Sequence, residues 1–247
     1  MKTYRNYIFD LYGTLVDIHT DEADPLLWLR LELWYAEHGA FYESPQALRA
    51  AYLRLCAAAQ AADPDPLFEL ELRDVFRALF AEKGVPADEA LIASTAVFFR
   101  IQSTKKLRLY PWVKPAFRQL RTAGKKIYLL SNAQACFTNP ELKALGLADA
   151  FDGIVLSSDA HIKKPSPKIM EGLLKTYDLS APDCLMTGND LTSDIAVAKA
   201  FGMDSLYLET ETSGPFDPEK AGTWAVRDKD WSRLPALFGL KDGNAAV

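Results

Sequence analysis

The chain has 247 residues, of which 49% are hydrophobic or aromatic and 25% are charged. This composition supplies a large apolar core and excludes a predominantly disordered, fibrous or low-complexity protein. The 28 Lys and Arg stand against 33 Asp and Glu, for a formal net charge of -5. Because no basic stripe interrupts this acidic balance, we expect no nucleic-acid partner and predict a small-molecule ligand instead.

Signals for membranes, secretion and disulfides are missing from the sequence. No apolar run approaches the roughly 20 residues that span a bilayer, and residues 1–10 lack the apolar stretch of a secretion signal. Cys56, Cys136 and Cys184 are odd in number and far apart, which favours reduced thiols. The three histidines are equally scattered, so we expect no zinc site. We therefore predict a cytoplasmic protein with no membrane contact, and no pattern indicates its oligomeric state.

Short apolar runs alternate with helical patterns over most of the chain. Each run is followed by a turn and predicts a buried strand, and the five runs are residues 7–9, 127–130, 154–156, 184–186 and 206–208. Helix start signals lie between them at Asn139-Pro140 and Ser166-Pro167, and residues 209–222 are predicted to be a loop. This alternation predicts an α/β fold with a doubly wound, Rossmann-like parallel sheet.

Residues 17–106 depart from the alternation, because they show helix periodicity and no strand candidate. Apolar residues recur three and four positions apart between Leu48 and Ala59 and again between Leu72 and Phe80. We therefore predict an all-helical cap domain at 17–106, inserted into a core domain formed by residues 1–16 and 107–247. Because the insert follows the first strand, we expect it over that strand's carboxyl end, where open sheets of this type bind ligands.

Polar residues follow four of the predicted strands in turn. They are Asp10-Leu11-Tyr12-Gly13-Thr14, Ser131-Asn132, Lys163-Lys164-Pro165, and Gly188-Asn189-Asp190 with Asp194 four residues further on. Alone, each has an ordinary explanation as a turn, a helix cap or solvated surface charge. Because consecutive parallel strands end at the same edge of a sheet, we expect all four groups to share one crevice.

Three carboxylates in that crevice, from Asp10, Asp190 and Asp194, would repel one another and would require a raised pKa or a cation. Mg²⁺ is a hard ion that typically uses one or two carboxylates, waters and a substrate phosphate oxygen. With a phosphate present, Asp10 can attack phosphorus to form an aspartyl-phosphate, which water then hydrolyses. The metal and Lys164 would offset the charge, and Ser131 with its neighbour Asn132 would donate hydrogen bonds.

The order of the motifs, Asp-x-x-Gly-Thr, Ser, Lys-Pro and Gly-x-Asp-x-x-x-Asp, resembles the haloacid dehalogenase-like (HAD) hydrolase superfamily over nearly the whole chain. The helical insert lies where that superfamily's C1 cap lies. The resemblance implies that Asp10 is the nucleophile, that the Tyr12 carbonyl is a metal ligand, and that Asp194 orients Lys164 or a metal-bound water. The predicted site residues are Asp10, Tyr12, Ser131 and Lys164 for catalysis, Gly13, Thr14, Ser131, Asn132 and Lys164 for the substrate, and Asp10, Tyr12, Asp190 and Asp194 for Mg²⁺.

Two positions depart from the superfamily's pattern. Tyr12 stands where its phosphatases carry an acid/base Asp, and a phenol with a pKa near 10 is a poor general base at neutral pH, so the rate could fall by roughly a hundredfold or more. Asn189 stands where relatives often carry the acid, so the metal ligand can be Asn189 or Asp190. A small phosphorylated metabolite is the substrate that this interpretation predicts.

Two alternatives stay open. A Tyr at position 12 also resembles the 2-haloacid dehalogenases of the same superfamily, whose aspartate displaces halide from carbon without a metal. Those enzymes tend to have a Tyr six positions after the motif lysine, where this chain has Met170. The second alternative is a protein that binds a phosphorylated ligand without turning it over.

Overall fold

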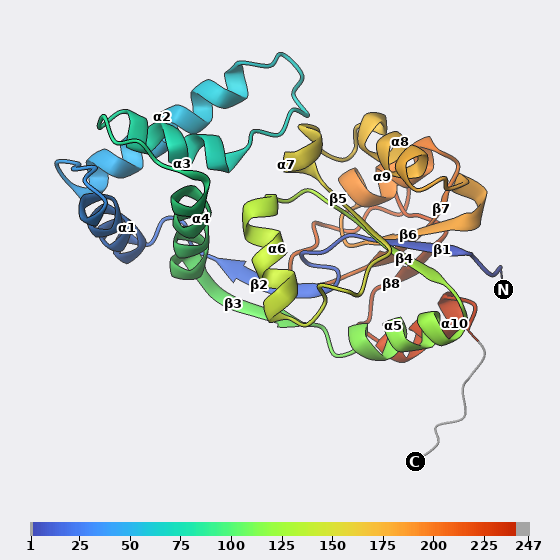
Figure 1. Cartoon of the computed structure of the whole chain (residues 1–247). Coiled ribbons are helices and arrows are strands. Elements are labelled where there is room, and N and C mark those ends of the chain that lie inside the picture. Colours follow the sequence, from blue (N-terminus) through green and yellow to red (C-terminus); the bar gives the residue numbers. More distant parts are fainter. Residues whose placement is uncertain (1, 241–247) are drawn as a thin grey trace.

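A parallel sheet with the strand order β5-β4-β1-β6-β7-β8 forms the centre of the protein in a computed structural model (Figure 1). The model describes residues 2–240, so residues 241–247 of the predicted core lie outside the described residues. The strands are β1 (Asn6–Phe9), β4 (Lys126–Ser131), β5 (Gly153–Leu156), β6 (Cys184–Gly188), β7 (Asp204–Leu208) and β8 (Trp224–Val226). The first five coincide with the five predicted runs, which confirms the α/β fold with a doubly wound parallel sheet.

Helices cover both faces of this sheet. On one face lie α5 (Val113–Thr122) and α10 (Leu234–Leu237), and on the other lie α8 (Pro167–Thr176) and α9 (Ala196–Ala200), as Figure 1 shows. Two apolar clusters separate the layers, one around Phe9, Phe117 and Phe238 and one around Ile8 and Met186. The alternation of side chains along β1 divides Ile8 and Phe9 between these two faces. Helices α6 (Ala135–Ala144) and α7 (Ser157–Ala160) follow β4 and β5 at the carboxyl edge.

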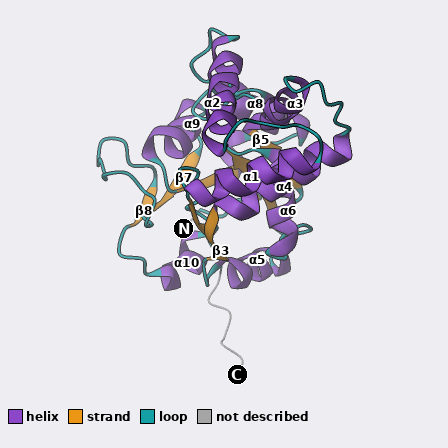
Figure 2. Ribbon diagram, turned by 90° about the vertical axis from the view of Figure 1, so that its left-hand side faces the viewer, coloured by secondary structure: helices purple, strands orange, loops and turns teal. Residues whose placement is uncertain are grey.

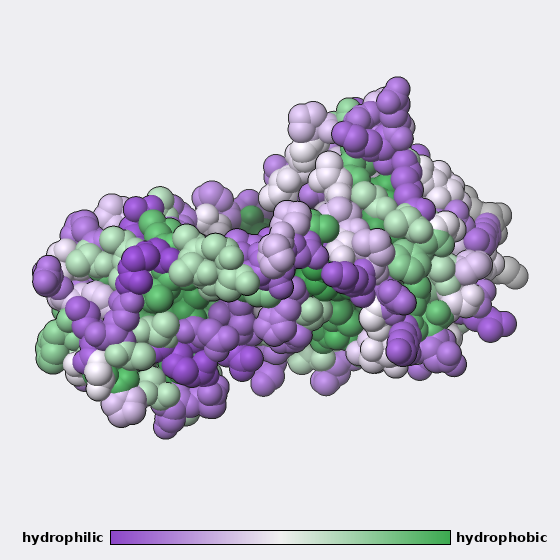
Figure 3. Space-filling model, turned by 90° about the horizontal axis from the view of Figure 1, so that it is seen from above, coloured by the Kyte–Doolittle hydropathy of each residue, from purple (hydrophilic) through white to green (hydrophobic). Residues whose placement is uncertain are grey.

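Four helices form the insert between the first strand and the rest of the sheet. They are α1 (Pro25–Glu37), α2 (Pro45–Ala61), α3 (Leu72–Ala81) and α4 (Glu89–Ser103). The side chains of Asp24, Ser44, Glu71 and Asp88 cap their amino ends. An apolar cluster of their own holds them together, and it includes one buried side chain from α6, Phe137. In space-filling view the insert and the sheet domain lie side by side as two lobes (Figure 3).

Three strands and one helix differ from the predictions. The antiparallel pair β2 (Val16–Thr20) and β3 (Thr104–Leu109) connects the insert to the sheet, so the prediction of no strand within 17–106 is wrong. Asp17 on β2 binds Lys106 and Arg108 on β3, and such charged strands lack the apolar run that a buried strand shows. Helix α6 begins at Ala135 rather than at Asn139. Ala135, Phe137 and Thr138 are buried in the added first turn, and this packing keeps the turn helical ahead of Pro140. Strand β8 was also missed.

The insert lies at the carboxyl edge of the sheet. In the view turned by 90°, α1 and α4 lie in front of the strands (Figure 2). Two segments at this edge bond to the insert: Gln134, after β4, contacts Glu69 and the Leu70 carbonyl, and Lys163, after β5, donates its backbone N–H to the Leu67 carbonyl. Among the described residues, no helix is both long and apolar enough to cross a bilayer, and the three cysteines form no disulfide.

Candidate active site

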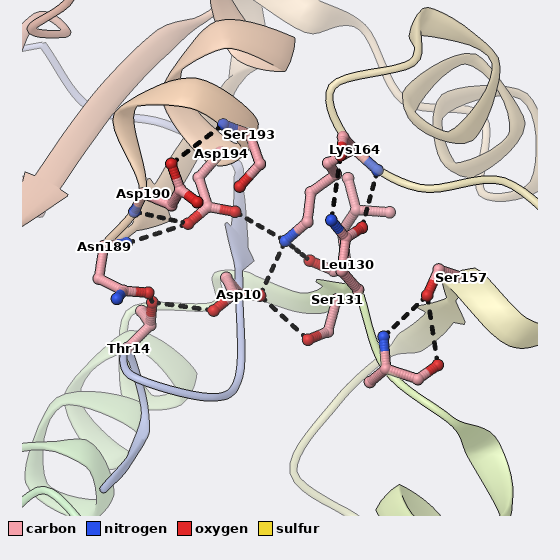
Figure 4. A network of polar contacts seen from close by, with 12 residues as sticks. Asp10, Thr14, Leu130, Ser131, Ser157, Lys164, Asn189, Asp190, Ser193 and Asp194 are labelled. Atoms are coloured by element: carbon pink, nitrogen blue, oxygen red, sulfur yellow. Dashed lines mark hydrogen bonds and ion pairs between the residues drawn. The ribbon is translucent and has the colours of Figure 1, made fainter. Parts of the chain in front are cut away.

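Asp10 lies directly after β1 and is the meeting point of the sequence motifs (Figure 4). Its Oδ1 accepts hydrogen bonds from Ser131 Oγ at 3.0 Å and from Lys164 Nζ at 2.8 Å. Its Oδ2 accepts one from Thr14 Oγ1 at 3.1 Å. Asp10 is 6% exposed. The structure thus brings residues at or after the ends of β1, β4 and β5 onto one carboxylate.

Lys164 is buried between two carboxylates. Its ammonium donates to Asp10 Oδ1 at 2.8 Å, to Asp194 Oδ1 at 2.7 Å and to the Leu130 carbonyl at 2.7 Å, which uses all three of its hydrogens. Burial alone would lower the pKa of Lys164, but Asp10 and Asp194 outweigh it and hold that pKa above its ordinary value. One ammonium between two carboxylates leaves a net charge of about -1 in a region almost closed to solvent.

Asp194 orients the lysine. While its Oδ1 binds Lys164, its Oδ2 accepts the backbone N–H groups of Asn189 at 3.0 Å and Asp190 at 3.1 Å. Burial raises the pKa of Asp194, although Lys164 opposes the shift. A Cβ at Gly188 would lie 2.3 Å from the Asp194 carboxyl, so only glycine fits there. Of the two partners predicted for Asp194, a lysine or a metal-bound water, the structure places the lysine against it.

Asp190 lies apart from this cluster. Its side chain is exposed, and its Oδ1 accepts from the backbone N–H groups of Thr192 and Ser193 and from the Thr192 hydroxyl. Asp190 therefore caps the short π-helical turn at residues 191–195, and these hydrogen bonds outweigh the effect of burial and lower its pKa. Within residues 2–240, no three His, Cys, Asp or Glu side chains are grouped to hold a metal ion. The structure does not bring the three predicted carboxylates together as ligands.

Asn189 shares a hydrogen-bond partner with Asp10, whereas its exposed neighbour Asp190 does not. Its Oδ1 accepts from Thr14 Oγ1 at 3.0 Å, and the same hydroxyl donates to Asp10 Oδ2 at 3.1 Å. A hydroxyl carries one hydrogen, so one of these two oxygens lacks a full donor at any moment. The pair of oxygens is therefore suited to a hard cation.

Hydroxyl groups after β7 complete the site, and their role was not predicted from the sequence. Thr212 Oγ1 accepts from Asn189 Nδ2 at 3.1 Å, Ser213 Oγ donates to the Asn189 carbonyl at 2.9 Å, and Thr210 Oγ1 donates to the Gly13 carbonyl at 2.7 Å. Gly13 has φ +82°, and a Cβ there would lie 2.2 Å from the Thr212 hydroxyl. Gly13 therefore permits a tight turn, in which its backbone N–H bonds to the Val16 carbonyl rather than pointing free toward a substrate. The one available signal was that these hydroxyls follow a fifth strand at the same edge.

Asn132 has a different contact from the one predicted. Its Nδ2 donates to the Lys164 carbonyl at 3.0 Å, and its Oδ1 accepts the Lys164 backbone N–H at 2.7 Å. Both polar groups of the amide are used to hold the backbone of the lysine loop. In this arrangement Asn132 positions Lys164, whereas Ser131 offers its hydroxyl to the cluster directly.

The Tyr12 hydroxyl contacts α6 rather than the Asp10 cluster. It donates to Glu141 Oε2 and lies 3.0 Å from Thr138 Oγ1. Burial, followed by the charge of Glu141, raises the pKa of Tyr12. The phenol is therefore neutral at physiological pH and does not act as a base, and its predicted role in proton transfer finds no support in these contacts.

The chain is similar to known proteins over most of its length. A family model described as haloacid dehalogenase-like hydrolase matches residues 4–202. A phosphoglycolate phosphatase of Yersinia pseudotuberculosis is 32% identical over 211 residues, which cover 84% of this chain and 82% of that protein. A solved 2-haloacid dehalogenase from Pseudomonas syringae pv. tomato has a TM-score of 0.67 at 22% identity, covering 96% of this chain and 99% of its own. A HAD phosphatase from Thermococcus onnurineus has a TM-score of 0.58 at 21% identity, covering 97% and 98%. The chain belongs to the haloacid dehalogenase-like hydrolase family.

Proposed function

We propose that this hydrolase is a Mg²⁺-dependent phosphatase that acts on a small phosphorylated metabolite through an aspartyl-phosphate at Asp10. The observation that carries the proposal is the Asp10 carboxylate held between Lys164 and Ser131 at the end of β1. A carboxylate held in this way can attack phosphorus, while the buried ammonium and the hydroxyl offset charge on the transferring group. The phosphoglycolate phosphatase relative supports a phosphoric monoester as the substrate. Residues 17–106, inserted after β1, would act as the cap of this site.

The oxygens around Thr14 fit a magnesium ion. Asp10 and Asn189 each direct a side-chain oxygen to the Thr14 hydroxyl, and the cluster around Lys164 carries a net negative charge. Asp10, Asn189 and the Tyr12 carbonyl would hold the ion, which when bound supplies positive charge against a phosphoryl oxygen. One carboxylate and two neutral oxygens make a weak site, so binding would depend on the substrate's own phosphate. Between the two predicted candidates, these contacts favour Asn189 over Asp190.

Replacing the amide by a carboxylate should strengthen this metal site. We expect Asn189→Asp to lower the Mg²⁺ concentration that gives half-maximal activity by about tenfold, because it adds a charged oxygen ligand. The measurement is a Mg²⁺ titration of p-nitrophenyl phosphate hydrolysis. Asp190→Asn is the matched control and should leave the titration within about twofold, because Asp190 only caps a turn. A larger shift for Asp190→Asn than for Asn189→Asp would reverse the ligand assignment.

A second function is 2-haloacid dehalogenation, which is favoured by Tyr12 and is the activity named for the dehalogenase neighbour whose fold this chain shares. Against it, Met170 is fully buried at the place where those enzymes tend to have a Tyr. The test compares two reactions. Hydrolysis of p-nitrophenyl phosphate that requires Mg²⁺ and stops with chelator supports the phosphatase, whereas chloride release from 2-chloropropionate in chelator supports the dehalogenase. Thermal stabilisation by inorganic phosphate with no turnover would instead indicate a binding protein.

A further inference from the structure

A buried chain of polar contacts runs from the nucleophile loop to the helical insert. Tyr12, two residues after Asp10, donates its hydroxyl to Glu141 on α6. The other carboxylate oxygen of Glu141 accepts from Arg100 Nε at 2.6 Å, and Arg100 lies on α4 of the insert. The side chains of Arg100 and Glu141 are 13% and 8% exposed. Three segments far apart in sequence therefore meet at one carboxylate.

Arg100 also contacts the tyrosine directly. Its guanidinium carbon lies 5.4 Å from the centre of the Tyr12 ring and 5.1 Å from that of Phe137. A guanidinium over an aromatic ring gains cation–π attraction, which is stronger where water is excluded. Arg100 thus holds the ring while Glu141 holds the hydroxyl, and the Tyr12 side chain is restrained at both ends.

The backbone beside Tyr12 forms a tight turn next to the nucleophile. The N–H groups of Thr14, Leu15 and Val16 all bond to the Leu11 carbonyl, and the Gly13 N–H bonds to Val16. Thr14, in the same turn, donates to Asp10. A shift of the Tyr12 side chain would therefore move the turn that holds the attacking carboxylate.

We propose that Arg100 and Glu141 are positioning residues that act through Tyr12. They fix the turn at residues 11–16 beside Asp10 and couple the order of this turn to the docking of α4. The inference rests on the proposed function for its kinetic consequence only. A buried ion pair contributes little net stability, but its geometry is well defined, so the pair between Arg100 and Glu141 is suited to a positioning role. A displacement of about 1 Å at a reacting group can cost a rate factor of up to about a hundred.

Kinetics of single and double variants test the coupling. We expect Tyr12→Phe, Glu141→Gln and Arg100→Met each to lower kcat for p-nitrophenyl phosphate by about tenfold with KM changed by less than about twofold. Because the three residues act as one unit, Tyr12→Phe combined with Arg100→Met should also lose about tenfold, whereas independent roles would give about a hundredfold. The shape of the pH–rate profile should not change in Tyr12→Phe, since the buried phenol does not titrate in that range. Additive losses would overturn the proposal.

Hydrogen exchange tests the same inference without any turnover. The amides of residues 13–16 should exchange at least about tenfold faster in Glu141→Gln and Arg100→Met than in the wild type, and Arg100→Lys, which keeps the charge, should lie between. Asp152→Asn is the matched control, because it removes a partly buried partner of Arg121 and Lys126 at the other end of the sheet. It should lower the thermal midpoint and leave exchange at 13–16 unchanged. Unchanged exchange in the Glu141 and Arg100 variants would overturn the inference even if the wild type proves to be a phosphatase, whereas faster exchange would uphold it in a protein that has another activity.

Discussion

Lys164→Met will lower the free energy of unfolding by about 3–5 kcal/mol and abolish turnover, because it leaves the buried carboxylates of Asp10 and Asp194 without a cation. Both side chains are almost fully buried, and both bond to the Lys164 ammonium. Removing one partner of a buried ion pair costs far more than the pair contributes, since the remaining charge is uncompensated. Urea denaturation of both proteins at neutral pH measures the difference.

The pH dependence of the variant provides a control. Without Lys164, the charge that opposes the effect of burial on Asp194 is gone, so its raised pKa rises further in the folded state and folding retains a proton that the unfolded chain releases. The stability gained from this proton is present below the ordinary carboxyl pKa, near 4, and is lost as the pH rises through the raised value. The loss of unfolding free energy in Lys164→Met should therefore be smaller at about pH 4. Adding Asp194→Asn should recover part of the lost stability at neutral pH. A deficit independent of pH would show that lost packing, not uncompensated charge, causes it.

Asp10→Asn is expected to reduce turnover by about 10⁴-fold or more while leaving the fold intact, because an amide does not form the covalent intermediate. The amide oxygen can still accept from Ser131 and Lys164, and Lys164 keeps Asp194 as its counter-ion. The thermal midpoint should be equal to or above that of the wild type, since one buried charge is removed. Steady-state kinetics and a thermal melt of the same sample measure both effects.

Asp190→Asn serves as the control for that substitution, because it makes the same chemical change at an exposed carboxylate outside the cluster. It should keep turnover within about threefold of the wild type. If Asp10→Asn retained more than about a tenth of the activity, or if Asp190→Asn lost as much as Asp10→Asn, the assignment of the nucleophile would be wrong.

Local patterns were enough to predict five of the six strands of the parallel sheet. A buried parallel strand is a short apolar run, so all five runs became strands. Strands β2 and β3 were not predicted, because charged residues such as Asp17 and Arg108 pair across the ribbon and interrupt any apolar run, and much of β3 is exposed. Strand β8 has three residues and lies at the edge, where so short a segment has little pattern to read.

The site was predictable to the extent that it depends on strand ends. The rule that parallel strands end at one edge brought Asp10, Ser131, Lys164 and Asp194 together. It did not show where each side chain points, because that depends on hydrogen bonds between distant segments. Tyr12 contacts α6 and Asp190 caps its own turn, although both follow the strands as the motifs predicted.

Covalent trapping tests directly whether Asp10 is the nucleophile that forms an aspartyl-phosphate. The protein is mixed with p-nitrophenyl phosphate and Mg²⁺, quenched in acid within the first turnover, digested and examined by mass spectrometry. We expect a phosphoryl group on the peptide that contains Asp10, formed only with Mg²⁺ and missing in Asp10→Asn. Steady turnover with no phosphoryl group on that peptide, or an ester of Asp10 with the carbon of 2-chloropropionate formed in chelator, would contradict it.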